Sequence, residues 1–252
     1  MGTIAITGAA SGIGAATRAR LETDGHTVIG IDLRDAEVIA DLATPQGRAS
    51  MVDDVGAASG GALDGLVACA GIGGENGELV TRINYFGAQA TLDGLRPLLA
   101  PRGGAAVALS SNSATTVPGV DPSFVDAGLA GDEERAVEIA EGMAGFTVYP
   151  GTKIALAWWV RRQAVTDAWI GSGVRLNAVN PGLIDTPLND GRVEEYLSLG
   201  ELYPIPAKRA AQPQEVASLI AWMLSDDAAF LVGSCFYLDG GTDAAMNPDR
   251  VP

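Results

Sequence analysis

The stretch that decides the fold is Thr3-Ile-Ala-Ile-Thr7-Gly8-Ala-Ala-Ser-Gly12-Ile-Gly14. Its apolar start is typical of a buried strand, and a segment of helical period begins at Gly12. Gly8 permits a sharp turn, Gly12 lets a ligand approach the backbone, and Gly14 lets the helix pack closely on the strand. Phosphates bind favourably at such a helix N-terminus, because its backbone N–H groups point outward. The stretch therefore predicts a strand–turn–helix unit that binds a dinucleotide.

An acidic residue follows the glycine turn at the spacing expected for a ribose ligand. Asp32 ends the next predicted strand, about 20 residues beyond the turn. A carboxylate there can accept hydrogen bonds from both ribose hydroxyls of NAD, and it repels the extra phosphate of NADP. Arg34 lies nearby, and a guanidinium is suited to binding that phosphate. We therefore expect NAD as the cofactor, with an NADP-linked enzyme as the alternative.

Short apolar runs alternate with segments of helical period along the rest of the chain. This alternation predicts an α/β fold of Rossmann type, a doubly wound parallel sheet of about seven strands in three layers. No Pro-, Ser- or charge-rich linker stands out, so residues 1–252 are expected to form a single dinucleotide-binding domain. The predicted strands are Thr3–Thr7, Thr27–Asp32, Val38–Asp41, Leu63–Ala68, Ala105–Ser110, Val174–Val179 and Ser234–Leu238. The predicted helices are Gly12–Asp24, Pro45–Ala58, Leu79–Ala100, Tyr149–Ile170 and Gln214–Leu224.

Residues 112–148 interrupt this alternation and are predicted to be an insertion near the substrate site. The segment carries Pro118 and Pro122, and then an acidic helical stretch over residues 132–143. Segments beside a site often close over the substrate. We expect the insertion to form a lid, an oligomer contact, or both. A lid would have an apolar edge formed by Val117, Val120, Phe124, Val125 and Leu129.

Charge and composition argue against several classes of function. The net charge is −15 and no basic cluster stands out, so neither nucleic acid nor a membrane surface is expected as a partner. No apolar run is long enough to span a bilayer, and no signal peptide is expected before the first strand. His26 is the single histidine, which excludes a Ser-His-Asp hydrolase. Cys69 and Cys235 predict neither a metal site nor a disulfide framework, and we expect a cytoplasmic protein.

Tyr149 and Lys153 stand four residues apart at the start of a predicted helix. Residues at this spacing share a helical face, so the phenol and the ammonium can point into one cleft. A phenol has a pKa near ~10 and is a poor acid–base group at neutral pH, but a nearby cation lowers that pKa. Lys153 and the positive ring of an oxidised nicotinamide are together suited to this task. By itself such a pair is weak evidence, because it is common by chance.

Five motifs, however, occur in a fixed order along the chain. They are the glycine turn at 8–14, Asn84-Tyr-Phe-Gly87, Ser110-Ser111, Tyr149 with Lys153, and Asn180-Pro-Gly182. In this order the chain resembles the short-chain dehydrogenase/reductase family over essentially its whole length, through Leu238-Asp-Gly-Gly241. Several stretches resemble, within that family, the bacterial 3α-hydroxysteroid dehydrogenase/carbonyl reductases. These are Gly30–Leu42, Asp64–Val67, Gly173–Asn177 and Asp239–Gly241.

The resemblance implies roles for individual residues. Tyr149 matches the family's general acid–base, and Lys153 matches the residue that tunes it and holds the nicotinamide ribose. Ser111 matches the hydroxyl that holds the substrate oxygen, and Asn84 matches the residue that positions a proton-relay water. The residues expected at the cofactor are Gly8, Ser11, Gly12, Ile13, Gly14, Asp32, Leu33, Asp41, Leu42, Cys69, Ala70, Gly71, Tyr149, Lys153, Pro181, Gly182, Ile184 and Thr186.

The chain departs from the family pattern at two places. Cys69-Ala-Gly71 replaces the usual Asn-Ala-Gly, and Ser111 is separated from Tyr149 by far more residues than usual. The substrate pocket is expected to be formed by the insertion and by residues 187–206. The predicted function is hydride transfer between NAD and a secondary alcohol or ketone, such as a hydroxysteroid, in a homodimer or homotetramer. The alternatives are an NADP-linked carbonyl or acyl reductase and a non-catalytic NAD-binding sensor, which would be expected to lose Tyr149 or Lys153.

Overall fold

The computed structural model describes residues 1–189 and 191–250, which build around one parallel sheet. The strands follow the order β3-β2-β1-β4-β5-β6-β7, and every neighbouring pair is parallel. The predicted doubly wound sheet is thereby confirmed. The strands are β1 (Thr3–Thr7), β2 (Thr27–Asp32), β3 (Val38–Ile39), β4 (Gly65–Ala68), β5 (Ala105–Leu109), β6 (Arg175–Pro181) and β7 (Cys235–Leu238).

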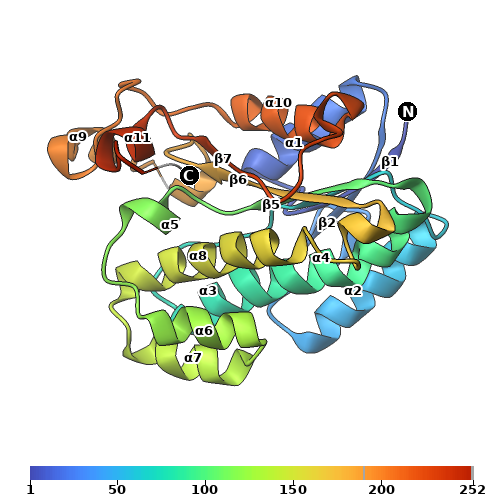
Figure 1. Cartoon of the computed structure of the whole chain (residues 1–252), viewed down its shortest axis with the longest axis horizontal. Helices are drawn as coiled ribbons and strands as arrows, with labels where there is room; N and C mark the ends of the chain where they lie inside the picture. The colour runs from blue at the N-terminus through green and yellow to red at the C-terminus, as the bar shows by residue number, and fades with distance from the viewer. Residues whose placement is uncertain (190, 251–252) are drawn as a thin grey trace.

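Helices cover both faces of the sheet and give the molecule three layers (Figure 1). One face is covered by α1 (Gly12–Thr23) and α10 (Pro213–Leu224), which pack against each other. The other face is covered by α2 (Pro45–Ala58), α4 (Ala88–Leu99) and α8 (Gly145–Gln163). The chain thus winds to both sides of β1, as the alternation of strands and helices predicts.

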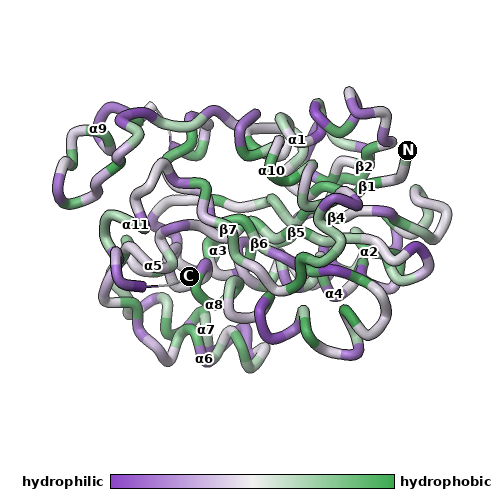
Figure 2. Tube along the Cα trace, turned by 45° about the horizontal axis from the view of Figure 1, so that its top comes forward, coloured by the Kyte–Doolittle hydropathy of each residue, from purple (hydrophilic) through white to green (hydrophobic). Residues whose placement is uncertain are grey.

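Each face of the sheet buries its own apolar cluster. Ile6 and Val67 belong to the cluster under α1 and α10, whereas Ala5 and Leu66 belong to the cluster under α2, α4 and α8. Successive side chains of a strand point to opposite faces, so a sheet covered on both sides needs continuous apolar strands. Figure 2 shows this concentration of hydrophobic residues along the central strands.

The carboxyl ends of the parallel strands meet at one edge of the sheet. At this edge the strand order reverses, because β1 is flanked by β2 on one side and by β4 on the other. Ligands of open α/β sheets bind in the crevice at such a reversal. Thr7, Asp32, Ala68, Leu109 and Pro181 stand at these strand ends. The fold therefore places the ends of β1, β2, β4, β5 and β6 around one candidate site.

Strand boundaries agree best with prediction at the start of the chain. β1 and β2 have the predicted bounds, but β3 stops at Ile39 instead of Asp41. Asp41 begins a turn, since its carboxylate accepts the N–H of Ala43 at 2.9 Å and its carbonyl accepts the N–H of Thr44 at 3.3 Å. A local side-chain hydrogen bond of this kind competes with strand pairing.

The helix predicted over Leu79–Ala100 is broken into parts, so that prediction was wrong in detail. α3 (Gly77–Thr81) runs into the π-helical element η1 (Arg82–Gly87), and α4 follows. A π-helical turn inserts an extra residue into the i→i+4 pattern and is frequent at functional sites. One extra residue in a helical turn leaves the hydrophobic periodicity almost unchanged. The sequence therefore predicts one continuous helix over Leu79–Ala100. Asn84 lies within this π-helical element.

The helix predicted over Tyr149–Ile170 is shifted toward the N-terminus. α8 begins at Gly145, after Ala144 in an extended conformation, and it ends at Gln163. The chain then turns inward, because Trp169 is fully buried and its ring lies 6.1 Å from that of Trp159 in a T-shaped pair. Core packing of an aromatic side chain therefore ends the helix earlier than its periodicity indicates.

The insertion folds into α5 (Ser113–Thr116), α6 (Pro122–Ala130) and α7 (Glu133–Gly142), of which only the last was predicted. α6 packs against α8 and α7 packs against α3, so these two helices form an additional layer below the sheet (Figure 1). Phe124 and Val125 of the expected apolar edge are 2% and 3% exposed. Their surface is therefore occupied by contacts with the protein and is not available to a substrate.

The remaining helical elements are all short. They are η2 (Ala100–Arg102), η3 (Ile170–Ser172), η4 (Pro187–Asn189), α9 (Val193–Ser198), η5 (Gly200–Leu202), η6 (Asp226–Ala228) and α11 (Thr242–Met246).

None of the helices within residues 1–189 and 191–250 combines the length and apolarity needed to cross a membrane. Asp190 of the expected substrate segment and residues 251–252 lie outside the described residues.

Candidate active site

The glycine turn between β1 and α1 has the geometry that only glycine allows. Gly8 and Gly12 have φ angles of +71° and +51°, and a Cβ on Gly14 would lie 2.0 Å from the carbonyl oxygen of Gly8. Ser11 is the N-cap of α1, and its side chain makes no capping hydrogen bond. Ile13 packs into the cluster under α1. The N-terminus of α1 is therefore held close to the strand, in the position where a pyrophosphate binds.

Asp32 at the end of β2 is held beside this turn. Its carboxylate accepts the N–H of Ala10 at 3.0 Å and that of Leu33 at 2.7 Å. Leu33 is exposed, as is Arg34, whose nearest acidic partner is 3.9 Å away. The carboxylate is therefore fixed and the guanidinium is not. This arrangement fits two unmodified ribose hydroxyls better than a ribose phosphate.

The segment after β6 lies next to the glycine turn. Pro181 ends β6, and Gly182 donates its N–H to the carbonyl of Leu238 at 3.0 Å. Ile184 is buried, and Thr186 is close enough that a Cβ on Gly12 would lie 3.5 Å from it. Thr186, far from Gly12 in sequence, thus lies beside the glycine turn at the N-terminus of α1.

The chain after β4 is fixed by a residue that the sequence reasoning passed over. The hydroxyl of Thr7 accepts the N–H groups of Cys69 at 3.0 Å and Ala70 at 3.1 Å. Thr7 therefore joins the ends of β1 and β4 without the side-chain amide that the family usually has here. Burial raises the pKa of the Cys69 thiol to about 12, so this thiol is neutral at physiological pH.

Asp41 and Leu42 lie after β3, at the far side of the crevice. Leu42 is buried and packs so closely on Gly87 that a Cβ there would lie 3.0 Å from that of Leu42. Asp41 is exposed, and its carboxylate bonds to the backbone of its own turn. The contact of these two residues with the cofactor stays a prediction.

Asn84 is completely buried and locked by two hydrogen bonds. Its side-chain oxygen accepts the N–H of Ile72 at 2.8 Å, and its side-chain amide donates to the carbonyl of Ile72 at 2.8 Å. Gly71 lies between Asn84 and the catalytic helix, since a Cβ on Gly71 would be 3.3 Å from Asn84 Oδ1 and 3.7 Å from Lys153 Nζ. The structure thereby brings Asn84 and Lys153 together on the same side of Gly71.

Ser111, Tyr149 and Lys153 form a continuous polar group. The Ser111 hydroxyl lies near enough to the phenol of Tyr149 to lower its pKa, and Lys153 Nζ lies 5.4 Å from the centre of the Tyr149 ring. Lys153 Nζ also donates to the carbonyl of Leu109 at 2.8 Å, and the Ser110 hydroxyl donates to the Lys153 carbonyl at 2.8 Å. These bonds tie α8 to the end of β5. They fix the spacing between the serine on the strand and the tyrosine on the helix.

Burial shifts both titratable groups toward their neutral forms. It raises the pKa of Tyr149 to about 12, against the opposing effect of the hydrogen bond from Ser111. It lowers the pKa of Lys153 to about 8. At neutral pH the phenol therefore holds its proton, while the lysine is still mostly a cation. Deprotonating this phenol requires positive charge beyond what the protein alone provides.

Asn112, Tyr196 and Tyr203 also lie near the site, within the two segments expected to form the substrate pocket. The side chain of Asn112, directly after Ser111, bonds to the hydroxyl of Tyr203, and the rings of Tyr196 and Tyr203 lie 6.1 Å apart. The phenols of Tyr196 and Tyr203 lie near enough to raise the pKa of Tyr149. Neither tyrosine belongs to a motif, because only the folded chain brings residues 196–203 to β5.

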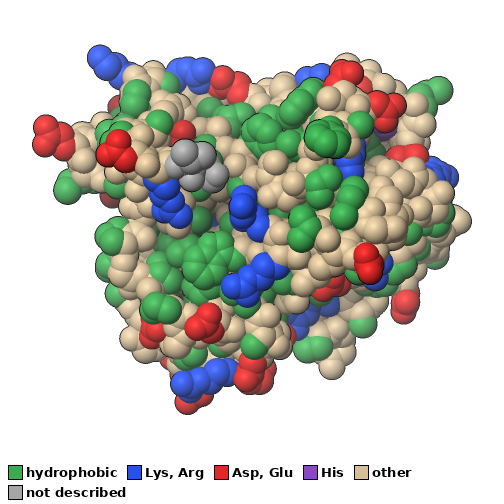
Figure 3. All heavy atoms as spheres, viewed as in Figure 1, with side chains coloured by type: hydrophobic (Ala, Val, Ile, Leu, Met, Phe, Trp, Pro, Cys, Tyr) green, Lys and Arg blue, Asp and Glu red, His purple; other side chains and the backbone are tan. Residues whose placement is uncertain are grey.

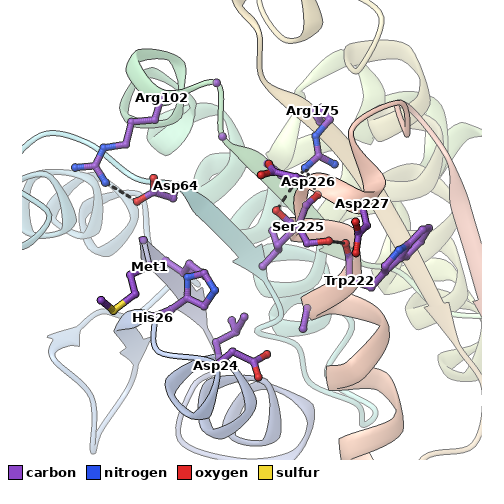
Figure 4. A pocket seen from close by; sticks show the side chains of 18 of the residues that line it. Met1, Asp24, His26, Asp64, Arg102, Arg175, Trp222, Ser225, Asp226 and Asp227 are labelled. Atoms are coloured by element: carbon purple, nitrogen blue, oxygen red, sulfur yellow. Dashed lines mark hydrogen bonds and ion pairs between the residues drawn. The ribbon is translucent and has the colours of Figure 1, made fainter.

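A cavity of about 520 Å³ lies at the opposite edge of the sheet, by the N-terminal ends of the strands (Figure 4). It is lined by polar residues that include His26 and the ion pair of Arg102 with Asp64. None of the residues predicted for the cofactor or the reaction lines it. In α/β sheets ligands bind outside the carboxyl ends of the strands, so this cavity is not the candidate active site.

The parallel sheet, the glycine turn and the Ser–Tyr–Lys group together define a nucleotide-linked dehydrogenase. Comparisons with known proteins agree. A family model described as enoyl-(acyl carrier protein) reductase matches residues 136–243. The 3-alpha-hydroxysteroid dehydrogenase/carbonyl reductase of Comamonas testosteroni is 42% identical and is matched over 99% of this chain and 100% of the relative. The cis-4-hydroxycyclohexanecarboxylate dehydrogenase of Sinomonas cyclohexanicum is 35% identical, over 95% of both chains.

A solved structure shows the same likeness in three dimensions. The 3-alpha-hydroxysteroid dehydrogenase from Pseudomonas sp. B-0831, complexed with NADH, has a TM-score of 0.92 and 45% identity, with 99% of this chain and 100% of that chain covered. The chain belongs to the short-chain dehydrogenase/reductase family and is an oxidoreductase. The family and the enzyme class predicted from the sequence are thereby confirmed.

Proposed function

We propose that the protein transfers a hydride between NAD and a secondary alcohol or ketone of alicyclic, apolar character, such as a hydroxysteroid. The observation that carries this proposal is the convergence of Ser111, Tyr149 and Lys153 at the end of β5, where Lys153 Nζ lies 5.4 Å from the centre of the Tyr149 ring and donates to the carbonyl of Leu109. Asp32, fixed beside the glycine turn, supports NAD over NADP. The relative in complex with NADH supports the same cofactor.

In this proposal the chain's own residues hold the substrate oxygen and move its proton. The hydroxyls of Ser111 and Tyr149 would both contact that oxygen and so orient the carbinol carbon for hydride transfer. The bound dinucleotide supplies the hydride acceptor or donor. In oxidation Tyr149 accepts the hydroxyl proton as the hydride leaves the carbon, and in reduction the phenol returns a proton to the oxygen. In this proposal Asn84 acts through the helix backbone to position a water that exchanges this proton with solvent.

Lys153 serves two purposes in the proposed reaction. Its positive charge stabilises the phenolate of Tyr149, whose pKa burial raises to about 12. Each pKa unit recovered corresponds to about 1.4 kcal/mol. Its ammonium is also placed to hold the nicotinamide ribose, after exchanging its bond to the carbonyl of Leu109 for one to the ribose. The pair is retained here, which argues against a non-catalytic sensor.

The names of the relatives support the substrate class. One acts on 3-alpha-hydroxysteroids and carbonyl compounds, and another on cis-4-hydroxycyclohexanecarboxylate. Both names describe a hydroxyl on a saturated ring. An NADP-linked carbonyl or acyl reductase is the second candidate, and the exposed guanidinium of Arg34 is the observation in its favour.

We also propose a cytoplasmic homodimer or homotetramer. Both cysteines are free thiols, as is usual in a reducing compartment. Hydrophobic side chains are exposed on the face that carries α10 (Figure 3). Trp222 is 40% exposed and pairs with Phe236 of β7 at 5.9 Å, and Phe230 is fully exposed. Analytical ultracentrifugation of Phe230→Asp tests this surface, since a charge there should shift the protein toward monomers.

The decisive test of the proposed reaction is a spectrophotometric screen. NAD and NADP reduction would be followed with 3α- and 17β-hydroxysteroids and with cyclohexanol, for wild type and Tyr149→Phe. We expect wild type to reduce NAD with a ring alcohol and Tyr149→Phe to lose about 10³-fold in kcat, the size of a general acid–base contribution. Tyr237→Phe, which removes a phenol hydroxyl from β7 with no hydrogen bond among the described residues, is the control. Equal activity of Tyr149→Phe and wild type would contradict the proposal.

A further inference from the structure

Asn112 and Tyr203 form a reciprocal hydrogen-bonded pair that the proposed reaction does not use. The Asn112 side-chain amide donates to the Tyr203 oxygen at 2.9 Å, and the Tyr203 hydroxyl donates to the Asn112 side-chain oxygen at 3.1 Å. Asn112 is 2% exposed. Burial also raises the pKa of Tyr203. Both groups are largely shielded from water. Removing either one therefore leaves the other without a hydrogen-bond partner, which is energetically costly.

Asn112 is fixed by contacts that do not involve Tyr203. Its backbone N–H donates to the carbonyl of Pro181 at 2.9 Å, which ties it to the end of β6. Its side-chain amide also lies 3.4 Å from Asp239, whose carboxylate accepts the N–H groups of Gly241 at 3.0 Å and Asp243 at 2.7 Å. Asn112 is therefore a rigid docking point beside Ser111, whether or not Tyr203 is bonded to it.

The segment that carries Tyr203 is otherwise held mainly at its two ends, where the Asn189 side-chain amide donates to the carbonyl of Ile184 and Pro206 packs against Gly241. Residues 187–206 are mostly exposed, and α9 projects from the end of the molecule (Figure 1). Within the described residues α9 packs closely on no other helix or strand. Within the segment, the ring of Tyr196 packs against the ring of Tyr203, and the guanidinium of Arg192 lies 5.8 Å from the Tyr196 ring. The bond to Asn112 is thus the main side-chain anchor between this segment and the end of β5.

We infer that Asn112 and Tyr203 are positioning residues that set substrate specificity, an inference that rests on the proposed function. Their bond holds the rings of Tyr196 and Tyr203 beside Tyr149, so that these rings form one wall of the substrate site. A bulky apolar alcohol contacts that wall, whereas a small ring alcohol reaches Ser111 and Tyr149 without it. The pair acts on the binding of large substrates and not on proton transfer.

The experiment compares Tyr203→Phe with wild type and with the control Tyr237→Phe. For a hydroxysteroid, Tyr203→Phe should raise KM about tenfold, the effect of losing one neutral hydrogen bond. For cyclohexanol, its KM should stay within twofold of wild type, and its pH–rate profile should move only toward lower pH, because the Tyr203 phenol raises the pKa of Tyr149. A KM rise of the same size for both alcohols, or no change for the steroid, would overturn the inference.

Trypsin cleavage supplies a readout that needs no turnover. Arg192 and Lys208 are exposed and flank the anchored tyrosines, so loss of the anchor should speed cleavage of the native enzyme about tenfold at these positions. Unchanged cleavage of Tyr203→Phe would overturn the anchoring role. If wild type oxidises neither alcohol, the proposed function fails, and the cleavage rates still decide whether the pair holds the segment.

Discussion

The two ends of the ligand crevice are built in different ways. At the glycine turn, φ angles and backbone contacts decide the geometry, and a Cβ on Gly14 would lie 2.0 Å from a carbonyl oxygen. At the substrate end, the geometry depends on side chains from distant segments, such as the pair of Asn112 with Tyr203. The first arrangement tolerates almost no change of residue type. The second permits changes that adjust the shape of the site while the cofactor end stays intact.

Replacing Phe124 should show most clearly that the substrate end and the cofactor end of the crevice can change independently. Phe124 is 2% exposed and packs α6 onto α8, so Phe124→Ala should lower the free energy of unfolding by about 3 kcal/mol. If the substrate end is independent, KM for a bulky alcohol rises while the dissociation constant of NADH stays within twofold. Urea unfolding and NADH fluorescence measure the two effects. Phe146→Ala, at a side chain that is 73% exposed, is the matched control.

Replacing Gly14 tests the cofactor end. The methyl of Gly14→Ala would meet the carbonyl of Gly8, so α1 must move away from β1. NADH affinity should fall about 100-fold, because the helix N-terminus no longer faces the phosphates in the right position. Gly56→Ala is the control, since a Cβ at Gly56 of α2 meets no atom within 4 Å. Unchanged NADH binding by Gly14→Ala would contradict the claim that the backbone geometry of the glycine turn determines cofactor binding.

Replacing Asp32 sharpens the comparison within the cofactor end. Asp32→Ser removes the carboxylate that repels a ribose phosphate and leaves Arg34 free to bind it. The preference for NAD over NADP, as the ratio of kcat/KM values, should fall about 30-fold, in line with the loss of one charged contact. Retention of the full preference would show that groups other than Asp32 set it.

Replacing Lys153, a residue of the proposed reaction, should also change the free energy of unfolding. Burial lowers the Lys153 pKa from 10.5 to about 8, so between these values the unfolded chain binds the proton and the folded chain does not. Stability from this group therefore rises with pH between about 8 and 10.5 and is lowest below 8. The pKa difference corresponds to about 3.4 kcal/mol at pH 7. Because Lys153→Met also loses the hydrogen bond to the carbonyl of Leu109, the variant should be more stable than wild type by about 1.5 kcal/mol at pH 7, an advantage that is lost toward pH 10.5. Urea titrations at both pH values check the sign.

The sequence predicts the backbone-determined parts of this protein best. β1 and β2 have the predicted bounds, because apolar period and glycine spacing are local signals. The π-helical turn that holds Asn84 was not predicted, since one inserted residue leaves no mark in the periodicity. α6 was also missed, and its Phe124 was expected to face a substrate instead of the core. Only the folded chain decides which of two surfaces an apolar side chain covers.

The residues of the reaction lie together as predicted, whereas the wall of the substrate site was not foreseen in detail. Ser111, Tyr149 and Lys153 meet at the end of β5, and their roles remain predictions for the kinetic tests. Tyr203 was covered only by the broad expectation for residues 187–206. A tyrosine in an exposed segment has no periodic or spacing signal, and its partner Asn112 became visible only through tertiary contact.

The burial of Lys153 has a practical consequence for labelling. The chain contains two lysines, Lys153 and Lys208. Lys153 is 4% exposed, whereas Lys208 is exposed just after the segment that carries Tyr203. An amine-reactive dye or resin therefore finds one lysine side chain, at a defined position by the mouth of the site. With the exposed α-amino group of Met1 blocked, coupling through Lys208 would orient every immobilised molecule alike, and a fluorophore there would report on the movement of the neighbouring segment.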